Sequence, residues 1–132
     1  MNQAFAKQRK SARRLESECA QHFGEPAARL LGDMSRKIGL GVVVRQDEEE
    51  VTVAGGCGAR IEMAKTPEGI CYRLCSIPRP AQHALKDMLE EGSLAERFGE
   101  DRANHPQIEY VKGSVRNVLR NQKKRLWQVS LP

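Results

Sequence analysis

Six basic side chains follow one another closely near the C-terminus, and no acidic residue interrupts them: Lys112, Arg116, Arg120, Lys123, Lys124 and Arg125. On a helix, cations four residues apart repeat along one side and can meet successive phosphates of a nucleic acid backbone. Trp127 follows and offers a ring on which a base can stack. The segment therefore predicts contact with RNA or single-stranded DNA. A solvated basic face beside a buried apolar one is the competing interpretation.

A second basic cluster lies near the N-terminus and consists of Lys7, Arg9, Lys10, Arg13 and Arg14. The two clusters hold half of the 22 Lys and Arg, so the rest of the chain carries 11 basic against 17 acidic residues. Such segregation of charge steers approaching polyanions. Residues 1–14 are a candidate flexible basic arm that would assist the C-terminal segment. The acidic turn at residues 47–50 is an alternative, intramolecular partner for one cluster.

The remaining chemistry-bearing residues form no specific motif. The four cysteines, Cys19, Cys57, Cys71 and Cys75, lack the spacing of a zinc site and are expected to pack as small hydrophobic side chains. Cys57 lies among glycines and could act as a nucleophile only with a basic partner nearby, so thiol chemistry there is the third hypothesis. We expect a protein that is not an enzyme and that uses no cofactor or metal.

The bulk composition fits one small globular domain. The chain has 132 residues, is 39% hydrophobic and 30% charged, and contains only 5% aromatic residues, which predicts an aliphatic core. No apolar run approaches the roughly 20 residues that cross a bilayer, and the N-terminus lacks the pattern of a secretory signal. These features predict a cytoplasmic protein without a membrane partner and with reduced thiols.

Apolar periodicity places these clusters on helices at either end of a sheet. Residues 3–23 and residues 26–38 read as helices, the second with Pro26 in its first turn and Gly39 after its end. Alternation and β-branched side chains predict strands at residues 42–44, 51–54, 59–65 and 70–75. Further helices are expected at residues 80–91, from Ser93 to about Gly99, and from Pro106 onwards, followed by an extended stretch at residues 126–131 that could form an edge strand.

Together these elements predict a single α+β domain over residues 1–132. An antiparallel meander of three to four strands would be covered by N-terminal and C-terminal helices, in the order ααββββααα. The leading hypothesis is a small nucleic-acid-binding module. The alternative is an interaction or assembly subunit that docks its basic termini on an acidic partner protein. Formation of an oligomer is compatible with this alternative.

Overall fold

A computed structural model describes residues 8–56 and 58–112 of the chain. These ranges form four α-helices and one six-stranded mixed sheet, which confirms the α+β class. The strands are β1 (Gln8–Arg9), β2 (Val42–Gln46), β3 (Glu50–Ala54), β4 (Arg60–Thr66), β5 (Gly69–Cys75) and β6 (Gln107–Val111). The helices are α1 (Ala12–Phe23), α2 (Glu25–Ile38), α3 (Arg79–Leu85) and α4 (Glu91–Phe98).

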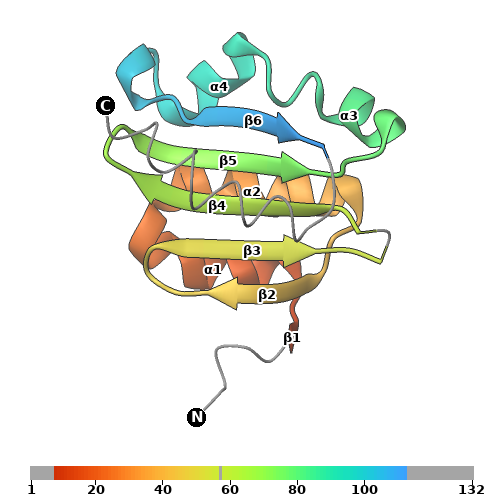
Figure 1. The fold of residues 1–132 in the computed structure, drawn as a ribbon. Coiled ribbons are helices and arrows are strands. Elements are labelled where there is room, and N and C mark those ends of the chain that lie inside the picture. The colour runs from red at the N-terminus through yellow and green to blue at the C-terminus, as the bar shows by residue number, and fades with distance from the viewer. Residues whose placement is uncertain (1–7, 57, 113–132) are drawn as a thin grey trace.

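The six strands lie side by side in the order in which they occur along the chain (Figure 1). Neighbours from β1 to β5 pair antiparallel, and β6 pairs parallel with β5. The predicted four-strand meander is therefore present as β2 to β5. The predicted order was wrong at both ends, because β1 and β6 extend the meander into a larger sheet.

The helices α1 and α2 pack against each other and cover one face of the sheet (Figure 1). Their apolar stripes meet the inward-facing side chains of β3, β4 and β5, and the resulting core is mainly aliphatic, as the composition predicted. Tyr72 is the largest fully buried side chain, and its hydroxyl donates a 2.6 Å hydrogen bond to the carbonyl oxygen of Ala27 in α2. This bond fixes the helical layer on the middle of the sheet.

The two N-terminal helices differ in how well they follow the prediction. α2 has Pro26 in its first turn, and Gly39, with φ of 90°, takes the left-handed conformation at its C-cap. α1 begins only at Ala12, where the Ser11 side chain accepts a hydrogen bond from the Arg14 amide. The preceding residues Gln8–Arg9 form β1, and residues 3–7 of the predicted helix lie outside the described ranges.

The predicted helix from Pro106 onwards was wrong over the part that the structure describes. Residues Gln107–Val111 form β6, with Gln107 and Glu109 alternating with Ile108 and Tyr110 in the period of two that strands require. A parallel partner is reached only by a long crossover, and the chain makes it from β5 through α3 and α4. The continuation of the predicted helix beyond Lys112 and the extended stretch at residues 126–131 lie outside the described residues.

The helices of this crossover are short. α3 ends at Leu85 rather than at residue 91, and α4 begins at Glu91, so that Gly92 lies inside it instead of ending the preceding helix. Within residues 8–56 and 58–112, no helix has both the length and the hydropathy needed to span a bilayer.

Candidate binding groove beside strand β6

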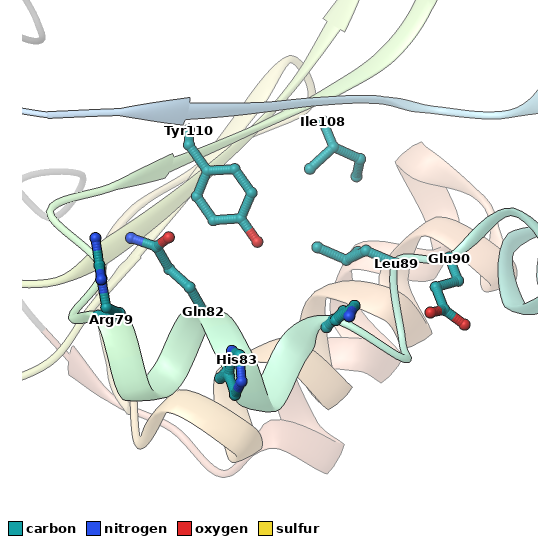
Figure 2. A pocket seen from close by; sticks show the side chains of 8 residues that line it. Arg79, Gln82, His83, Leu89, Glu90, Ile108 and Tyr110 are labelled. Carbon is teal, nitrogen blue, oxygen red and sulfur yellow. The ribbon is translucent and has the colours of Figure 1, made fainter.

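The groove between α3 and β6 is the candidate functional site. It has a volume of about 670 Å³, within the range of pockets that hold small ligands or single residues of a polymer. Its lining residues are Arg79, Gln82, His83, Lys86, Leu89, Glu90, Ile108 and Tyr110. Figure 2 shows Ile108 and Tyr110 pointing from β6 towards α3, and Gln82 rising from α3 beside Tyr110.

The groove contains two cations, Arg79 and Lys86, that have no ion-pair partner within the described part of the chain. Arg79, His83 and Lys86 are exposed, and none of them forms an ion pair with a residue of the described ranges. Glu90 is the one acidic side chain in the lining. The charges of Arg79 and Lys86 are therefore available to an anionic ligand.

Tyr110 lies at the centre of this region. Its side chain is 46% exposed, and it is the one large hydrophobic residue of the described ranges that is exposed to this extent. A second hollow of about 390 Å³ adjoins the groove, and Gln82 and Tyr110 line both of them. Lys112 lines this second hollow, so that both hollows that share Tyr110 contain at least one cation.

Lys112 connects the groove to the predicted C-terminal site. It was predicted on a helix, but it is the exposed residue that directly follows β6. Arg116, Arg120, Lys123, Lys124, Arg125 and Trp127 lie outside the described residues. The chain nevertheless enters that basic segment from the end of β6, beside the groove.

The N-terminal basic cluster has a different environment. Lys10 Nζ lies 2.6 Å from Glu18 Oε1 and 2.7 Å from Gln46 Oε1, and Arg14 Nε lies 2.9 Å from Glu18 Oε2. The hydrogen bond from Lys10, followed by those from Gln46 and Arg14, lowers the pKa of Glu18 to about 2. Two of the predicted binding residues, Lys10 and Arg14, are thus paired with an acidic side chain of the protein itself.

The other members of the N-terminal cluster are less constrained. Arg9 and Arg13 are exposed and form no ion pair with any residue in the described ranges, and Lys7 lies outside those ranges. In the acidic turn at residues 47–50, the alternative intramolecular partner, Asp47 Oδ2 lies 2.9 Å from Arg45 Nε and Glu50 Oε1 lies 2.8 Å from Arg45 Nη1.

The described parts of the two basic clusters lie at opposite edges of the sheet. β1 leads directly into Lys10, and β6 leads directly into Lys112, and these are the first and last strands of the six. Five spacings between strands correspond to about 24 Å. The structure therefore does not bring Lys10 and Lys112 onto one edge.

A buried ion pair on the face opposite α1 and α2 is a second charged group. Glu62 and Arg73 are cross-strand partners in β4 and β5, and Arg73 Nη1 lies 2.9 Å from Glu62 Oε1. Glu109 of β6, the partner of Arg73 on its other side, contacts Arg73 Nε at 3.3 Å. Burial raises the pKa of Glu62, while the charge of Arg73 opposes this shift. Because both side chains of the pair are closed to solvent, we assign them to strand registration.

The cysteines show no sign of reactivity where the structure describes them. Cys19, Cys71 and Cys75 are buried, and burial raises the pKa of each thiol, to about 11 for Cys19 and Cys71 and about 12 for Cys75. Cys57 lies outside the described residues. Within those ranges, no three His, Cys, Asp or Glu side chains are grouped so as to hold a metal ion.

Sequence reasoning missed the groove residues, although part of the signal was present. Arg79, Gln82, His83 and Lys86 follow the spacing i, i+3, i+4, i+7 and so share one side of a helical segment. Tyr110 was missed because residues 106 onwards were read as a helix. Comparison of the chain with protein-family models, curated proteins and solved structures gave no match, so the interpretation of this groove depends on its own residues.

Proposed function

We propose that the protein binds nucleic acid through the β6 edge of its sheet. The basic C-terminal segment from Lys112 to Arg125 neutralises phosphates, and the cations of the groove extend this contact. The observation that carries the proposal is the combination, in one groove, of an exposed aromatic ring and cations without ion-pair partners among the described residues. Sites for flexible nucleic acid strands combine these same two features.

The position of Lys112 supports a continuous binding surface. It lines the hollow beside Tyr110, and the next basic residue in the sequence is Arg116. From Lys112 to Arg125 the sequence contains no acidic residue that would neutralise the segment. The six cations of this segment and the groove cations Arg79 and Lys86 then act on one polyanion.

The N-terminal cluster has a smaller role in this proposal. Lys10 and Arg14 are held by Glu18, so their charges are partly cancelled before any partner arrives. Lys7, Arg9 and Arg13 contribute to the field that steers a polyanion to the protein rather than to the bound contact. Substitution of Arg13 should therefore slow association more than it speeds dissociation.

The dependence of binding on salt tests the proposal. If six phosphates of a single strand are neutralised, the slope of log K against log salt is about −4, and affinity falls roughly 300-fold between about 50 and 200 mM salt. Reversal of two charges by Arg116→Glu and Arg120→Glu should weaken binding to all sequences alike and make the slope shallower by about 1–2. Fluorescence anisotropy with a labelled oligonucleotide measures both quantities.

A matched control is Lys37→Glu, because Lys37 is an exposed cation of α2 that forms no ion pair among the described residues. It should change binding much less than Arg116→Glu does. Binding that is insensitive to salt, or that falls equally with Lys37→Glu and with Arg116→Glu, would contradict the proposal.

An acidic protein partner is the second candidate, and the open edge of the sheet favours it. In the described part of the chain no strand pairs with the outer edge of β6. An extended acidic segment could pair there as a further strand, with alternate side chains directed into the groove. Binding of an acidic peptide that competes for Tyr110, together with indifference to RNA and DNA, would select this candidate.

A further inference from the structure

We infer that the groove between α3 and β6 holds one unstacked base of a single-stranded nucleic acid against the ring of Tyr110. This inference rests on the proposed function and specifies the ligand as single-stranded RNA or DNA rather than a duplex. The bases of a duplex are stacked and paired, so a duplex cannot lay the face of a base on the ring of Tyr110. A flexible strand can turn one base out towards a protein surface.

The position of Tyr110 suits it to stacking. Tyr110 is 46% exposed, and its hydroxyl makes no hydrogen bond with any residue in the described ranges. Figure 2 shows the ring projecting from β6 into the groove, where Ile108 and Leu89 supply further apolar surface. A base that stacks on Tyr110 therefore removes apolar surface from water without breaking a contact made within the described structure.

Gln82 gives the groove a polar group of fixed orientation. Its side-chain nitrogen donates a 2.9 Å hydrogen bond to the carbonyl oxygen of Ile77, which anchors the amide. The amide oxygen is then left as an acceptor beside Tyr110 (Figure 2). An exocyclic amino group or a ring N–H of a base is the donor that this oxygen fits.

The main chain of β6 offers further groups at the open edge of the sheet. The carbonyl oxygen of Val111 accepts a hydrogen bond from the Ser76 amide at 3.0 Å, so Val111 bonds inward to β5. Because consecutive residues of a parallel strand bond in opposite directions, Ile108 and Tyr110 direct their N–H and C=O groups outward. These groups can hydrogen-bond to a base edge or a sugar of a strand that runs along β6.

Cations line both hollows that share Tyr110, and they suit the phosphates that flank an extruded base. Arg79 and Lys86 line the groove, and Lys112 lines the adjoining hollow. A strand that passes over Tyr110 then meets positive charge before and after the stacked base.

Quenching of 2-aminopurine tests this placement, since the fluorescence of this base falls when it stacks on an aromatic ring. The probe is a single-stranded oligonucleotide of about 12 nucleotides with 2-aminopurine in its middle, a length within the usual site sizes for single strands. We expect wild-type protein and Tyr110→Phe to quench the probe, and Tyr110→Ala to leave most of the fluorescence. Affinity should fall roughly 5- to 150-fold for Tyr110→Ala and by less than about threefold for Tyr110→Phe.

Two further measurements distinguish failure of this inference from failure of the proposed function. The salt slope of Tyr110→Ala should equal that of the wild type, because a neutral ring is removed, whereas Arg116→Glu should make it shallower. The duplex of the same sequence should bind more weakly, and Tyr110→Ala should not affect its affinity. Trp127→Ala is the comparison variant, because Trp127 is the other aromatic side chain predicted to stack.

Each outcome leads to a decision. Quenching that persists in Tyr110→Ala, or that is lost only in Trp127→Ala, overturns the inference and leaves the proposed function in place. Duplex binding as tight as single-strand binding has the same consequence. Absence of binding to any nucleic acid at low salt overturns both, and binding of an acidic peptide to the groove in that case selects the protein partner.

Discussion

The two edges of the sheet use their cations differently. At the β1 edge, Lys10 and Arg14 are held by Glu18, and the amide of Gln46 completes the network. At the β6 edge, Arg79, Lys86 and Lys112 form no ion pair with any residue of the described ranges. Basic clusters of similar density in the sequence can therefore serve either the fold or a partner, and the acids within reach decide which.

The difference has a simple local origin. Glu18 lies one helical turn after Arg14 in α1, and β1 brings Lys10 beside the same carboxylate. In the groove, the one acidic lining residue is Glu90, beyond the end of α3. Substitution of paired cations should therefore reduce the free energy of unfolding, and substitution of groove cations should reduce binding alone.

The largest loss of stability is expected when the buried ion pair between Arg73 and Glu62 is broken. This loss is the most that we expect from the substitution of any paired cation in the protein. Arg73→Met leaves the Glu62 carboxylate buried without its principal counter-charge, and it should lower the free energy of unfolding by about 3–5 kcal/mol. The double variant with Glu62→Gln should recover part of this loss, because no buried charge then remains unpaired. Urea denaturation followed by circular dichroism measures both, and a loss below about 1 kcal/mol for Arg73→Met would contradict the structural role.

The two tyrosines provide the next contrast, because they lie on neighbouring strands in opposite environments. Tyr72 is fully buried and bonds to Ala27, and burial raises its pKa well above the usual value. Tyr72→Phe should lower the free energy of unfolding by about 1–2 kcal/mol, since a buried hydrogen bond is lost. Tyr110→Phe removes a hydroxyl with no described partner and should change stability by less than about 0.5 kcal/mol.

Urea denaturation of the two single variants is the measurement. If Tyr110→Phe destabilised the protein as much as Tyr72→Phe does, the exposed ring would belong to the fold, and its proposed contact with a base would lose its basis.

The β1 edge should show its pairing in the dependence of stability on pH. Glu18→Gln should lower the free energy of unfolding by about 1 kcal/mol at neutral pH, as expected for an ion-pair network at the surface. The pKa of Glu18 is about 2 in the folded protein and near 4.5 when unfolded, so its contribution is present above pH 4.5. It is lost as the pH falls towards 2, because both states then bind the proton.

Wild type and Glu18→Gln should therefore differ in stability at neutral pH and converge in acid. Arg13→Met is the matched control, because Arg13 lies in the same helix, is exposed and forms no ion pair among the described residues. Arg13→Met should leave the free energy of unfolding unchanged from acid to neutral pH. A difference between wild type and Glu18→Gln that is constant from pH 2 to pH 7 would show that the carboxylate charge has no stabilising role.

Most of the elements could be predicted from the sequence because their signals are local. α2 combines Pro26, an apolar stripe and Gly39, and β2 to β5 are marked by alternation and turn residues. β6 could not be found in this way. Residues 107–111 do alternate, but Pro106 and the later apolar residues also match a helix, and the strand depends on parallel pairing with β5 across the whole α3–α4 crossover.

Of the candidate site, only the concentration of basic residues could be predicted from the sequence. The sequence indicated that the basic residues are concentrated at the ends, but not that Glu18 engages Lys10 through a contact set by β1. It also gave no way to place Tyr110 beside α3, because that contact requires β6 to be the last strand of the sheet. Long-range pairing decided both points, and local periodicity contains no information about it.

The smallest change in stability is expected for substitutions in the groove itself. These substitutions also give the sharpest test of the difference between the β1 edge and the β6 edge. Arg79→Ala combined with Lys86→Ala removes two exposed cations that lack ion-pair partners in the described structure, so the free energy of unfolding should change by less than about 0.5 kcal/mol. Affinity for a single strand should nevertheless fall, and the salt slope should become shallower by about 1–2. Lys37→Ala is the control, because it removes an exposed cation outside the groove and should alter neither quantity.

The same double variant separates the two uses of charge in one experiment. Destabilisation comparable to that of Glu18→Gln would mean that the β6 edge, like the β1 edge, uses its cations for the fold. Unchanged stability with unchanged affinity would mean that the charges of the groove serve no polyanion. Unchanged stability with weakened, less salt-dependent binding is the outcome we expect, because a cation that stabilises no internal acid keeps its full electrostatic attraction for a phosphate.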